Sequence, residues 1–219
     1  MTNGVWAVVV ARAGRAPKSR LAAVLGTRDR RALALAMLAD VLDACASAAF
    51  DGTVAVVDTP EAETVCAAHR AHVVREPAHG LGGMNPAVSA GLHAVAGQGA
   101  ATAIVLPGDV PLVSQHDFEV LLAAAGRVSR AVVIGASRNG GGTNALLLRP
   151  PHVIAPSFGP PSVGRHTQAG QAAGAVTIVR RGLDLALDID TPDDLAALRA
   201  RPLTGSTGAL LERAGVSAE

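Results

Sequence analysis

Short apolar runs alternate with segments of helical periodicity along this chain, and that order restricts the fold more than any other feature. The runs are rich in β-branched residues and short enough for buried strands; they cover residues 5–11, 53–57, 103–106 and 131–136. Alternation of strands and helices is typical of parallel strand pairs joined by helices. We therefore expect an α/β fold in which a mainly parallel sheet lies between two layers of helices.

The other predicted elements complete this three-layer α/β/α arrangement. Apolar spacing and capping residues predict helices over residues 29–48, 60–71, 87–96, 117–125 and about 191–201, and short strands over 72–75, 145–148, 176–179 and 186–189. Extended segments follow one another directly around residues 131–148 and 176–189, which indicates an antiparallel edge on the sheet. A single domain over residues 1–219 is expected, with a partly mobile tail from about residue 203 that contains one short helical stretch.

The composition excludes several classes of function. A net charge of +1 and an aromatic content of 2% leave neither the basic surplus nor the stacking side chains of a nucleic-acid-binding protein. No uncharged apolar run approaches the roughly 18 residues of a membrane span, and the N-terminus lacks a signal-peptide pattern, so we expect a cytoplasmic protein. Cys45 and Cys66 lie apart without CxxC spacing and are expected to be reduced thiols in the core.

A basic loop follows the first predicted strand. It contains four cations within nine residues, namely Arg12, Arg15, Lys18 and Arg20. Ligands of open α/β sheets bind at the carboxyl ends of the strands, where backbone N–H groups and fixed cations can hold a triphosphate. The loop matches neither a Walker A nor a GxGxxG pattern. The alternative interpretation is a solvated basic loop.

Asp109 follows the apolar run 103–106, at the carboxyl end of the predicted strand. Gly108 precedes it and Pro111 follows two residues later. A carboxylate at this edge of an α/β sheet is well placed to bind a metal ion that meets a phosphate. The alternative interpretation is a turn or capping residue after the strand.

A second group of carboxylates lies near the C-terminus. Asp188 and Asp190 alternate with aliphatic residues in an extended segment, so both should point to one side. Two such carboxylates are costly unless a cation or solvent neutralises them. The alternative is a pair of exposed carboxylates in which Asp190 caps the last helix. Asp193 and Asp194 lie in the first turn of that helix, where they stabilise its dipole.

Glycine-rich loops supply further candidate ligand contacts. Residues 80–86 bring backbone close to a ligand and offer Asn85 as an amide that reads a base or a sugar. Residues 140–143 and 157–162 offer N–H and hydroxyl donors to a small anion, and Arg165 and His166 follow at once and could add charge. Each of these loops alone could also be an ordinary turn.

Several ordered motifs together resemble a known family. They are Pro17–Ala22, Met37-Leu38 with Asp40–Leu42, Leu106–Pro111, Phe158–Pro160 with Ser162, Arg165-His166 and Asp188–Pro192. This pattern is similar to the 2-phospho-L-lactate/phosphoenolpyruvate guanylyltransferases of coenzyme F420 biosynthesis, and it extends over about residues 5–198.

The resemblance implies a fold, a reaction and a set of site residues. The fold would be a GT-A-like nucleotidyltransferase, and the substrates GTP and a small phosphorylated carboxylic acid, with pyrophosphate released. Matching positions assign Mg²⁺ to Asp109 and Asp188, the nucleotide phosphates to Lys18 and Arg20, and the acceptor acid to Thr143, Gly159 and Ser162. With the loops described above, the expected nucleotide site comprises Arg12, Lys18, Arg20, Asn85 and Gly108, and the expected catalytic residues are Asp109, Asp188 and Lys18.

Two other functions stay open at this point. A molybdenum-cofactor cytidylyl- or guanylyltransferase would carry a loop of the type LAGGxSxRMG, whereas only Gly14 stands in this loop. A non-catalytic nucleotide-binding domain is disfavoured by the intact Lys18, Asp109 and Asp188. The sequence does not choose among phosphoenolpyruvate, 2-phospho-L-lactate and 3-phosphoglycerate, and it leaves open whether the protein is a homodimer.

Overall fold

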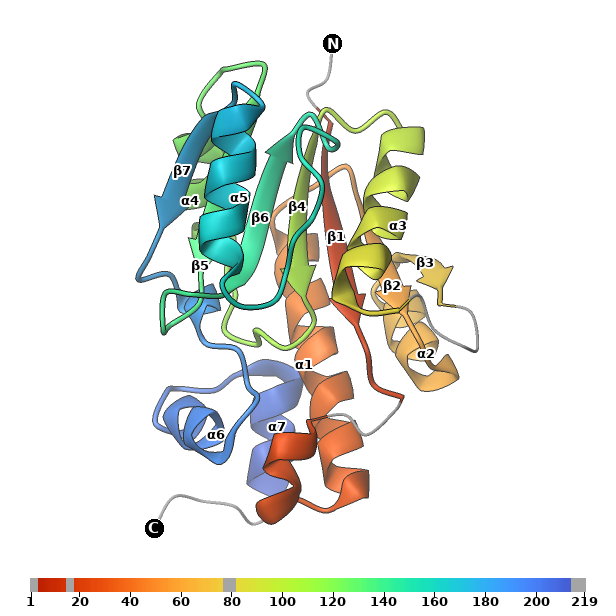
Figure 1. Cartoon of the computed structure of the whole chain (residues 1–219). Coiled ribbons are helices and arrows are strands. Elements are labelled where there is room, and N and C mark those ends of the chain that lie inside the picture. Colours follow the sequence, from red (N-terminus) through yellow and green to blue (C-terminus); the bar gives the residue numbers. More distant parts are fainter. Residues whose placement is uncertain (1–3, 15–17, 77–81, 214–219) are drawn as a thin grey trace.

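A seven-stranded sheet forms the centre of the computed structural model, which describes residues 4–14, 18–76 and 82–213. The strand order is β3-β2-β1-β4-β6-β5-β7 (Figure 1). The strands are β1 (Val5–Ala11), β2 (Gly52–Val57), β3 (His72–Arg75), β4 (Thr102–Pro107), β5 (Ala131–Ala136), β6 (Thr143–Arg149) and β7 (Val176–Arg180). The α-helices are α1 (Thr27–Ser47), α2 (Pro60–Ala68), α3 (Met84–Gly97), α4 (Gln115–Ala125), α5 (Ser162–Ala172), α6 (Pro192–Arg199) and α7 (Gly205–Arg213), and two 3₁₀ turns are η1 (Ser19–Ala23) and η2 (Asp184–Ala186).

The expected mainly parallel sheet is confirmed, and its antiparallel strand is β6. The β1–β2, β1–β4, β2–β3 and β5–β7 pairs are parallel, whereas β6 runs antiparallel to both β4 and β5. This strand therefore lies inside the sheet and not at its edge, because the hairpin from β5 inserts it beside β4. Its first residues, Thr143 and Asn144, consequently lie at the edge where the parallel strands end.

The strand predicted over residues 186–189 is wrong. Residues Asp184–Ala186 form η2, and the chain continues without pairing into the sheet. Gly182, with φ 73°, turns the chain after β7. The apolar residues Leu187 and Ile189 are buried in a separate cluster beyond the sheet, so their burial does not require a strand.

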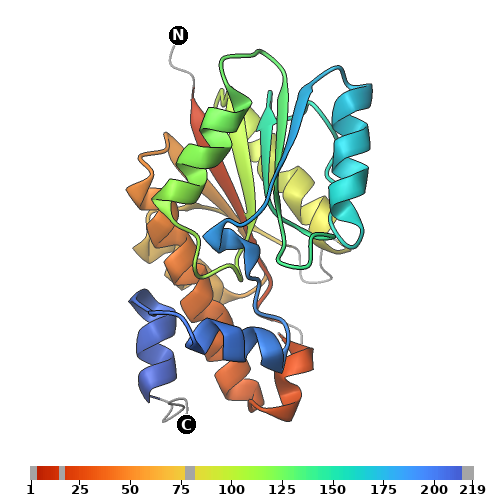
Figure 2. The ribbon, with the colours of Figure 1, turned by 90° about the vertical axis from the view of Figure 1, so that its left-hand side faces the viewer.

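Two apolar layers cover the faces of the sheet. One contains the inward residues of α1, α2 and α4, and the other contains those of α3 and α5. Figures 1 and 2 show α3 and α5 on one face and α1, α2 and α4 on the opposite face. Cys45 and Cys66 are free and buried, as expected, and burial raises their thiol pKa values to about 12 and about 11. Among the helices in the described ranges, none is long and apolar enough to cross a membrane.

A third apolar cluster joins the helices that lie beyond the carboxyl ends of β1 and β4. It draws on η1, α1, α6, α7 and the segment before α6; its buried members are Leu21, Leu33, Met37, Leu187, Ile189, Leu195, Leu198 and Leu211. Figure 1 shows this helical part below the arrowheads of β1 and β4. The cluster therefore fixes the segments on either side of the site, which carry Lys18 and the carboxylates near α6.

Two helices, α5 and α3, begin earlier than the sequence predicted, whereas α7 was expected. α5 begins at Ser162, inside a segment predicted as loop, because Pro160 and Pro161 precede it and obscure the helical pattern. α3 begins at Met84, three residues before the predicted start, because Pro86 lies in the first turn, where a helix tolerates proline. The short helical stretch expected in the tail is α7, and residues 214–219 lie outside the described part of the chain.

α7 is attached to α1 through Asp40. The carboxylate of Asp40 accepts hydrogen bonds from the backbone N–H groups of Ser206 (2.6 Å) and Thr207 (2.9 Å), which have no partner within the helix. Asp40 belongs to the motifs on which the family resemblance rests. Its place in the structure gives it the role of capping α7 from another helix.

Replacing Asp40 should loosen α7. Asp40→Ala leaves two N–H groups at the start of α7 without this partner, and we expect a loss of about 1 kcal/mol of stability, as for other capping residues. Amide hydrogen exchange of α7 should accelerate in this variant. The control is Asp43→Ala on the same helix, where an exposed carboxylate pairs with His69 and contributes little. Equal exchange rates in the two variants would contradict the capping role.

Candidate active site

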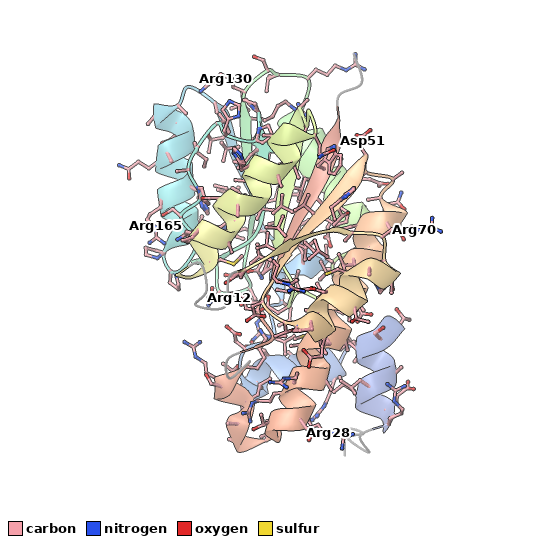
Figure 3. All side chains as sticks on the ribbon, turned by 90° about the vertical axis from the view of Figure 1, so that its right-hand side faces the viewer. Arg12, Arg28, Asp51, Arg70, Arg130 and Arg165 are labelled. Carbon is pink, nitrogen blue, oxygen red and sulfur yellow. The ribbon has the colours of Figure 1, made fainter. Side chains whose placement is uncertain are left out.

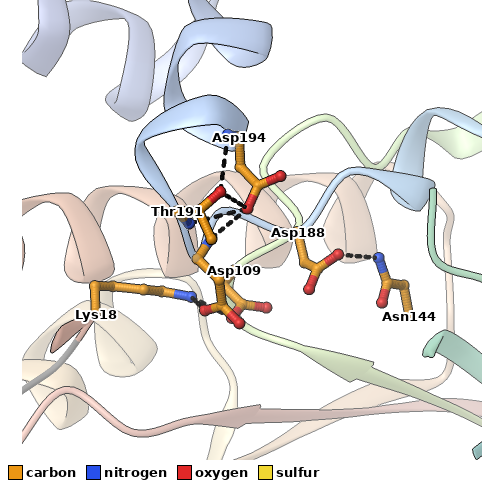
Figure 4. A network of polar contacts seen from close by, with 7 residues as sticks. Lys18, Asp109, Asn144, Asp188, Thr191 and Asp194 are labelled. Carbon is orange, nitrogen blue, oxygen red and sulfur yellow. Dashed lines mark hydrogen bonds and ion pairs between the residues drawn. The ribbon is translucent and has the colours of Figure 1, made fainter. Parts of the chain in front are cut away.

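Lys18 lies between two carboxylates at the carboxyl ends of β1 and β4 (Figure 4). Its ammonium group donates one hydrogen bond to Oδ2 of Asp109 and another to Oδ1 of Asp190 at 2.9 Å. The side chain of Lys18 is only 9% exposed. Burial by itself lowers the pKa of Lys18, but the two facing carboxylates outweigh it, so the pKa is raised and the ammonium stays charged.

The backbone at Lys18 directs this side chain into the site. Lys18 has φ 53° and ψ 46°, a left-handed conformation that is unfavourable for a residue with a side chain. Its carbonyl accepts from the N–H of Leu21 at 2.8 Å and so begins η1. Leu21 is fully buried in the third apolar cluster. Packing of Leu21 and the two ion pairs of Lys18 together stabilise a conformation that such residues rarely adopt.

Asp188 approaches the same place from the other side. Its Oδ1 accepts from Nδ2 of Asn144 at 3.1 Å, and the backbone N–H of Ile189 donates to the carbonyl of Asp109 at 3.1 Å. Burial first, and the charge of Asp109 in addition, raise the pKa of Asp188. The alternating pattern is confirmed, because Ile189 is buried in the cluster while Asp188 and Asp190 remain partly exposed.

The carboxylates of Asp109 and Asp188 are suited to a divalent cation whose other coordination positions are filled by a bound ligand. Oδ1 of Asp109 is buried and has no hydrogen-bond partner, which is costly unless something else binds it. Within the described ranges, no group of three or more His, Cys, Asp or Glu side chains has a metal-binding arrangement. Mg²⁺ commonly takes only one or two carboxylates and fills its remaining positions with substrate phosphates and water. Asp109 and Asp188 fit this pattern.

The segment after Asp190 is fixed by the cap of α6. Thr191 is the N-cap, and its side chain and that of Asp194 form a capping box, so Asp190 is not the cap. Asp194 also accepts from Arg138 at 2.9 Å and from the backbone N–H of Asp190 at 3.3 Å. The structural role predicted for Asp194 is confirmed. Asp193 is exposed beside it.

A cavity of about 220 Å³ opens next to this charged cluster. Four charged residues contribute to its lining: Arg12, Lys18, Asp109 and Asp190. The rest of the lining comes from Val10, Ala11, Ala13, Ala34, Met37, Leu38, Met84, Pro107 and Gly108. At Gly108 a Cβ atom would lie 2.7 Å from Cβ of Ala11. Only glycine therefore allows the chain after β4 to pass so close to β1 and present Asp109 to the cavity.

Asp58 fixes the backbone of the first loop. Its carboxylate, at the end of β2, accepts from the N–H groups of Ala13 (2.8 Å) and Gly14 (3.1 and 3.2 Å). A side chain at Gly14 would collide with it, because a Cβ would lie 2.8 Å from Oδ2 of Asp58. The sequence gives no sign of this role, since Asp58-Thr59-Pro60 indicates the start of a helix. These two N–H groups therefore bind the protein itself and not a phosphate.

The cations predicted in this loop have different positions. Arg12 lines the cavity and lies 3.6 Å from Oε1 of the buried Glu76. Figure 3 shows Arg12 between the sheet and the helical part. Arg20 is exposed and does not line the cavity. Arg15 lies outside the described residues.

Asn85 joins two loops. Its Nδ2 donates to the carbonyl of Phe158 at 3.2 Å, and its Oδ1 accepts from the N–H of Phe158 at 2.5 Å. Both polar atoms of the amide are thus paired with backbone. The contact of Asn85 with a nucleotide stays a prediction, whereas the contacts in the structure give it a positioning role between the start of α3 and the loop before α5.

The three residues predicted for the acceptor lie around the start of α5. Ser162 and Thr143 are buried, and their hydroxyl oxygens are 2.9 Å apart, with Ser162 as donor. Gly159 has φ 95°, and its carbonyl accepts from Arg165. The structure therefore brings all three predicted residues to one loop and one strand end.

Arg165 and His166, which the sequence suggested as added charge, have structural contacts instead. The guanidinium of Arg165 (Figure 3) donates to Oγ of Ser157 at 2.7 Å and to carbonyls of the same loop. His166 is fully buried, and burial, with the charge of Arg165 in addition, lowers its pKa to about 4. Near neutral pH, His166 is therefore uncharged.

Solved structures of known proteins share the fold of this chain. A Methanothermobacter thermautotrophicus nucleotidyl transferase is 19% identical, with a TM-score of 0.65 over 96% of this chain and 99% of its own. A Mycobacterium tuberculosis protein solved in complex with manganese is 20% identical, with a TM-score of 0.54 over 89% and 97% of the two chains. These likenesses confirm the expected fold.

Sequence relatives are more specific. A protein of Conexibacter woesei named phosphoenolpyruvate guanylyltransferase is 39% identical over 83% of this chain and 81% of its own. A protein of Phenylobacterium zucineum named 3-phospho-D-glycerate guanylyltransferase is 36% identical over 94% of both chains. Residues 6–207 match the family described as "Guanylyl transferase CofC like". The resemblance drawn from the motifs is confirmed, and the chain belongs to this guanylyltransferase family.

Proposed function

We propose that this protein transfers GMP from GTP to the phosphate of a small phosphorylated carboxylic acid, releasing pyrophosphate, as a step of coenzyme F420 biosynthesis. The observation that carries the proposal is the buried, unpartnered Oδ1 of Asp109 beside Lys18 and Asp188, at the strand ends of a chain in this family. We expect the reaction to take place in the cytoplasm, and the proposal is compatible with a monomer or a homodimer.

The transfer is a single displacement. A phosphate oxygen of the acid forms a bond to the α-phosphorus of GTP, the bond from that phosphorus to the bridging oxygen breaks, and pyrophosphate leaves with the electron pair. The attacking phosphate is already ionised near neutral pH, so no general base is required. Positioning and charge stabilisation then supply the rate. The absence of a charged histidine among the groups described at the site agrees with this chemistry.

Asp109 and Asp188 would hold a divalent cation, Mg²⁺ in the proposal. Bound there with phosphate oxygens, the cation would reduce the repulsion between two anionic substrates and stabilise the negative charge on the departing pyrophosphate. Asp109 offers its unpartnered Oδ1, and Asp188 offers a carboxylate whose raised pKa reflects the burial and charge that a cation would offset.

Lys18 contributes the fixed positive charge. Its ammonium already lies against Asp109 and Asp190, at the wall of the cavity. A triphosphate entering that cavity would meet this group, and Arg12 lines the same cavity. We assign the nucleotide phosphates to Lys18 with support from Arg12, and we place Arg20, which is exposed, at the outer end of the triphosphate. Gly108 provides the close backbone approach that brings Asp109 to it.

Thr143, Gly159 and Ser162 would bind the acceptor. They meet at the start of α5, and Asn144, next to Thr143 in β6, contacts Asp188. The acceptor site is therefore connected to the proposed metal site through two consecutive residues of one strand. The relatives named above act, by their names, on two different acids, so relatedness alone does not choose between them.

A direct assay tests the function. The purified protein is incubated with Mg²⁺, one nucleotide and one acid, and pyrophosphate release is measured for GTP and CTP with phosphoenolpyruvate, 2-phospho-L-lactate and 3-phosphoglycerate. We expect release with GTP and at least one of the three acids, and none without acid. Tight GTP binding without release in any mixture would instead favour a non-catalytic nucleotide-binding protein.

Asp109→Asn should abolish most of the activity. The amide keeps the shape of the side chain but removes the charge that binds the cation and pairs with Lys18, so we expect kcat to fall by about 100-fold or more. Asp193→Asn is the matched control, because Asp193 is an exposed carboxylate in the first turn of α6. Near-normal activity of Asp109→Asn at saturating Mg²⁺ would show that the metal assignment is wrong.

Lys18→Ala should separate two effects of the ammonium. Loss of the positive charge at the phosphates should lower kcat/KM for GTP by about 100-fold. The same change releases Asp109 and Asp190 from their ion pairs, so Mn²⁺, used as a probe without nucleotide, should bind on the order of tenfold more tightly. Arg28→Ala is the control, since Arg28 lies at the far end of the helical part (Figure 3). Unchanged Mn²⁺ affinity would mean that Lys18 does not compete for these carboxylates.

A further inference from the structure

A buried polar chain lies behind the proposed acceptor site, and its centre is His166. Nδ1 of His166 is 3.1 Å from Oγ1 of Thr143, which in turn lies 2.9 Å from Oγ of Ser162. Nε2 of the same ring accepts a hydrogen bond from the backbone N–H of Ser157 at 2.9 Å. His166 therefore connects the loop before α5 with the first residue of β6.

These contacts determine which ring nitrogen carries the proton. A backbone N–H can only donate, so Nε2, which accepts from Ser157, carries no hydrogen. In the neutral ring, the hydrogen must then be on Nδ1, and Nδ1 donates to Thr143. The low pKa of His166, caused by burial and by the neighbouring Arg165, keeps the ring in this neutral form.

The direction of the remaining hydrogen bonds follows from counting protons. His166, Thr143 and Ser162 bring three hydrogens, namely Nδ1–H and two hydroxyl hydrogens. Two contacts join the three side chains, and each contact uses one hydrogen. Because Ser162 donates to Thr143 and Nδ1–H of His166 does the same, the hydroxyl hydrogen of Thr143 is left over. Neither hydroxyl has a further hydrogen-bond acceptor among the contacts found for the described residues, so this hydrogen is available to a ligand.

We propose that His166 is a positioning residue that makes Thr143 and Ser162 present one O–H donor to an anionic oxygen of the acceptor acid. Because Nδ1–H and the Ser162 hydroxyl both donate to Thr143, the Thr143 hydroxyl has no acceptor within the chain and must donate outwards. An anionic oxygen accepts such a bond more strongly than water does. The inference rests on the proposed function and extends it to a residue that does not itself touch the substrate.

The loop that His166 contacts is held rigidly enough for this role. Arg165 donates to the side chain and the carbonyl of Ser157, and Asn85 pairs with both backbone groups of Phe158. The ring of Phe158 meets the His166 ring edge to face, with 5.2 Å between centroids and an interplanar angle of 73°. The imidazole is thus fixed on both sides, and its Nδ1–H can point only toward Thr143.

Two amide substitutions test the two ring nitrogens separately. In His166→Asn, the amide reaches the position of Nδ1 and can still donate to Thr143. In His166→Gln, the amide reaches the position of Nε2, so it can accept from Ser157 but leaves Thr143 without its donor. We expect the KM for the acid to rise about tenfold or more in His166→Gln and by less in His166→Asn, with the KM for GTP within twofold of wild type in both. His93→Gln, an exposed histidine on α3, should leave both KM values unchanged.

The outcomes are distinguishable. A wild-type protein that releases no pyrophosphate with any of the three acids overturns the proposed function and this inference with it. An active wild-type protein whose His166→Gln variant binds the acid normally overturns the inference alone. The same holds if the KM values for acid and GTP rise in parallel, because a merely structural role of His166 would affect both substrates. Thermal unfolding of each variant, measured alongside, confirms that the KM values refer to folded enzyme.

Discussion

The ion pairs of Lys18 with Asp109 and Asp190 are the contacts on which this site depends. Three carboxylates, counting Asp188, converge where β1 and β4 end, and the charge of Asp109 contributes to the raised pKa of Asp188. Repulsion between partly buried carboxylates destabilises the folded protein unless a cation lies among them. The ammonium of Lys18 supplies that cation within the protein. The backbone of Lys18 is held in an unfavourable left-handed conformation. The third apolar cluster contains Leu21 and Ile189, and it keeps the segments that carry Lys18, Asp188 and Asp190 in place.

The same arrangement prepares the site for its substrates. One oxygen of Asp109 is bound by Lys18 while the other is buried without a partner, so the carboxylate is only half satisfied. Incoming phosphates would offer Lys18 an alternative anion, and a divalent cation would take up the oxygens that Lys18 leaves. Three carboxylates against one ammonium leave the cluster with excess negative charge, which a divalent cation would offset. We therefore expect this site to bind metal and nucleotide together more tightly than either alone, since each would supply ligands or charge that the other needs.

Residues at strand ends could be predicted from the sequence, whereas their partners could not. Asp109 follows an apolar run directly, and Asp188 and Asp190 show their common side through alternation with Leu187 and Ile189; both signals are local. Asn144 contacts Asp188 only because β6 is inserted antiparallel beside β4, a feature of topology that the extended segments indicated without giving its position. Asp58 resembles an ordinary start of a helix, and its bonds to the first loop depend on how β1 and β2 lie side by side. The contacts of His166 were hidden because two prolines precede α5, so a segment that forms a helix looked like a loop.

The polar chain around His166 also bears on the choice of acid. Phosphoenolpyruvate, 2-phospho-L-lactate and 3-phosphoglycerate share a carboxylate and a phosphate and differ in the few atoms between them. A single outward O–H donor from Thr143 recognises an anionic oxygen, which all three acids possess, so it adds affinity without discrimination. Differences of one methylene-sized group in an apolar wall are worth only about 10- to 200-fold. We therefore expect discrimination to come from the walls around the shared anion site and from any polar group that meets the free hydroxyl of 3-phosphoglycerate. An anion contact that all three acids share agrees with relatives of similar identity whose names give different acids.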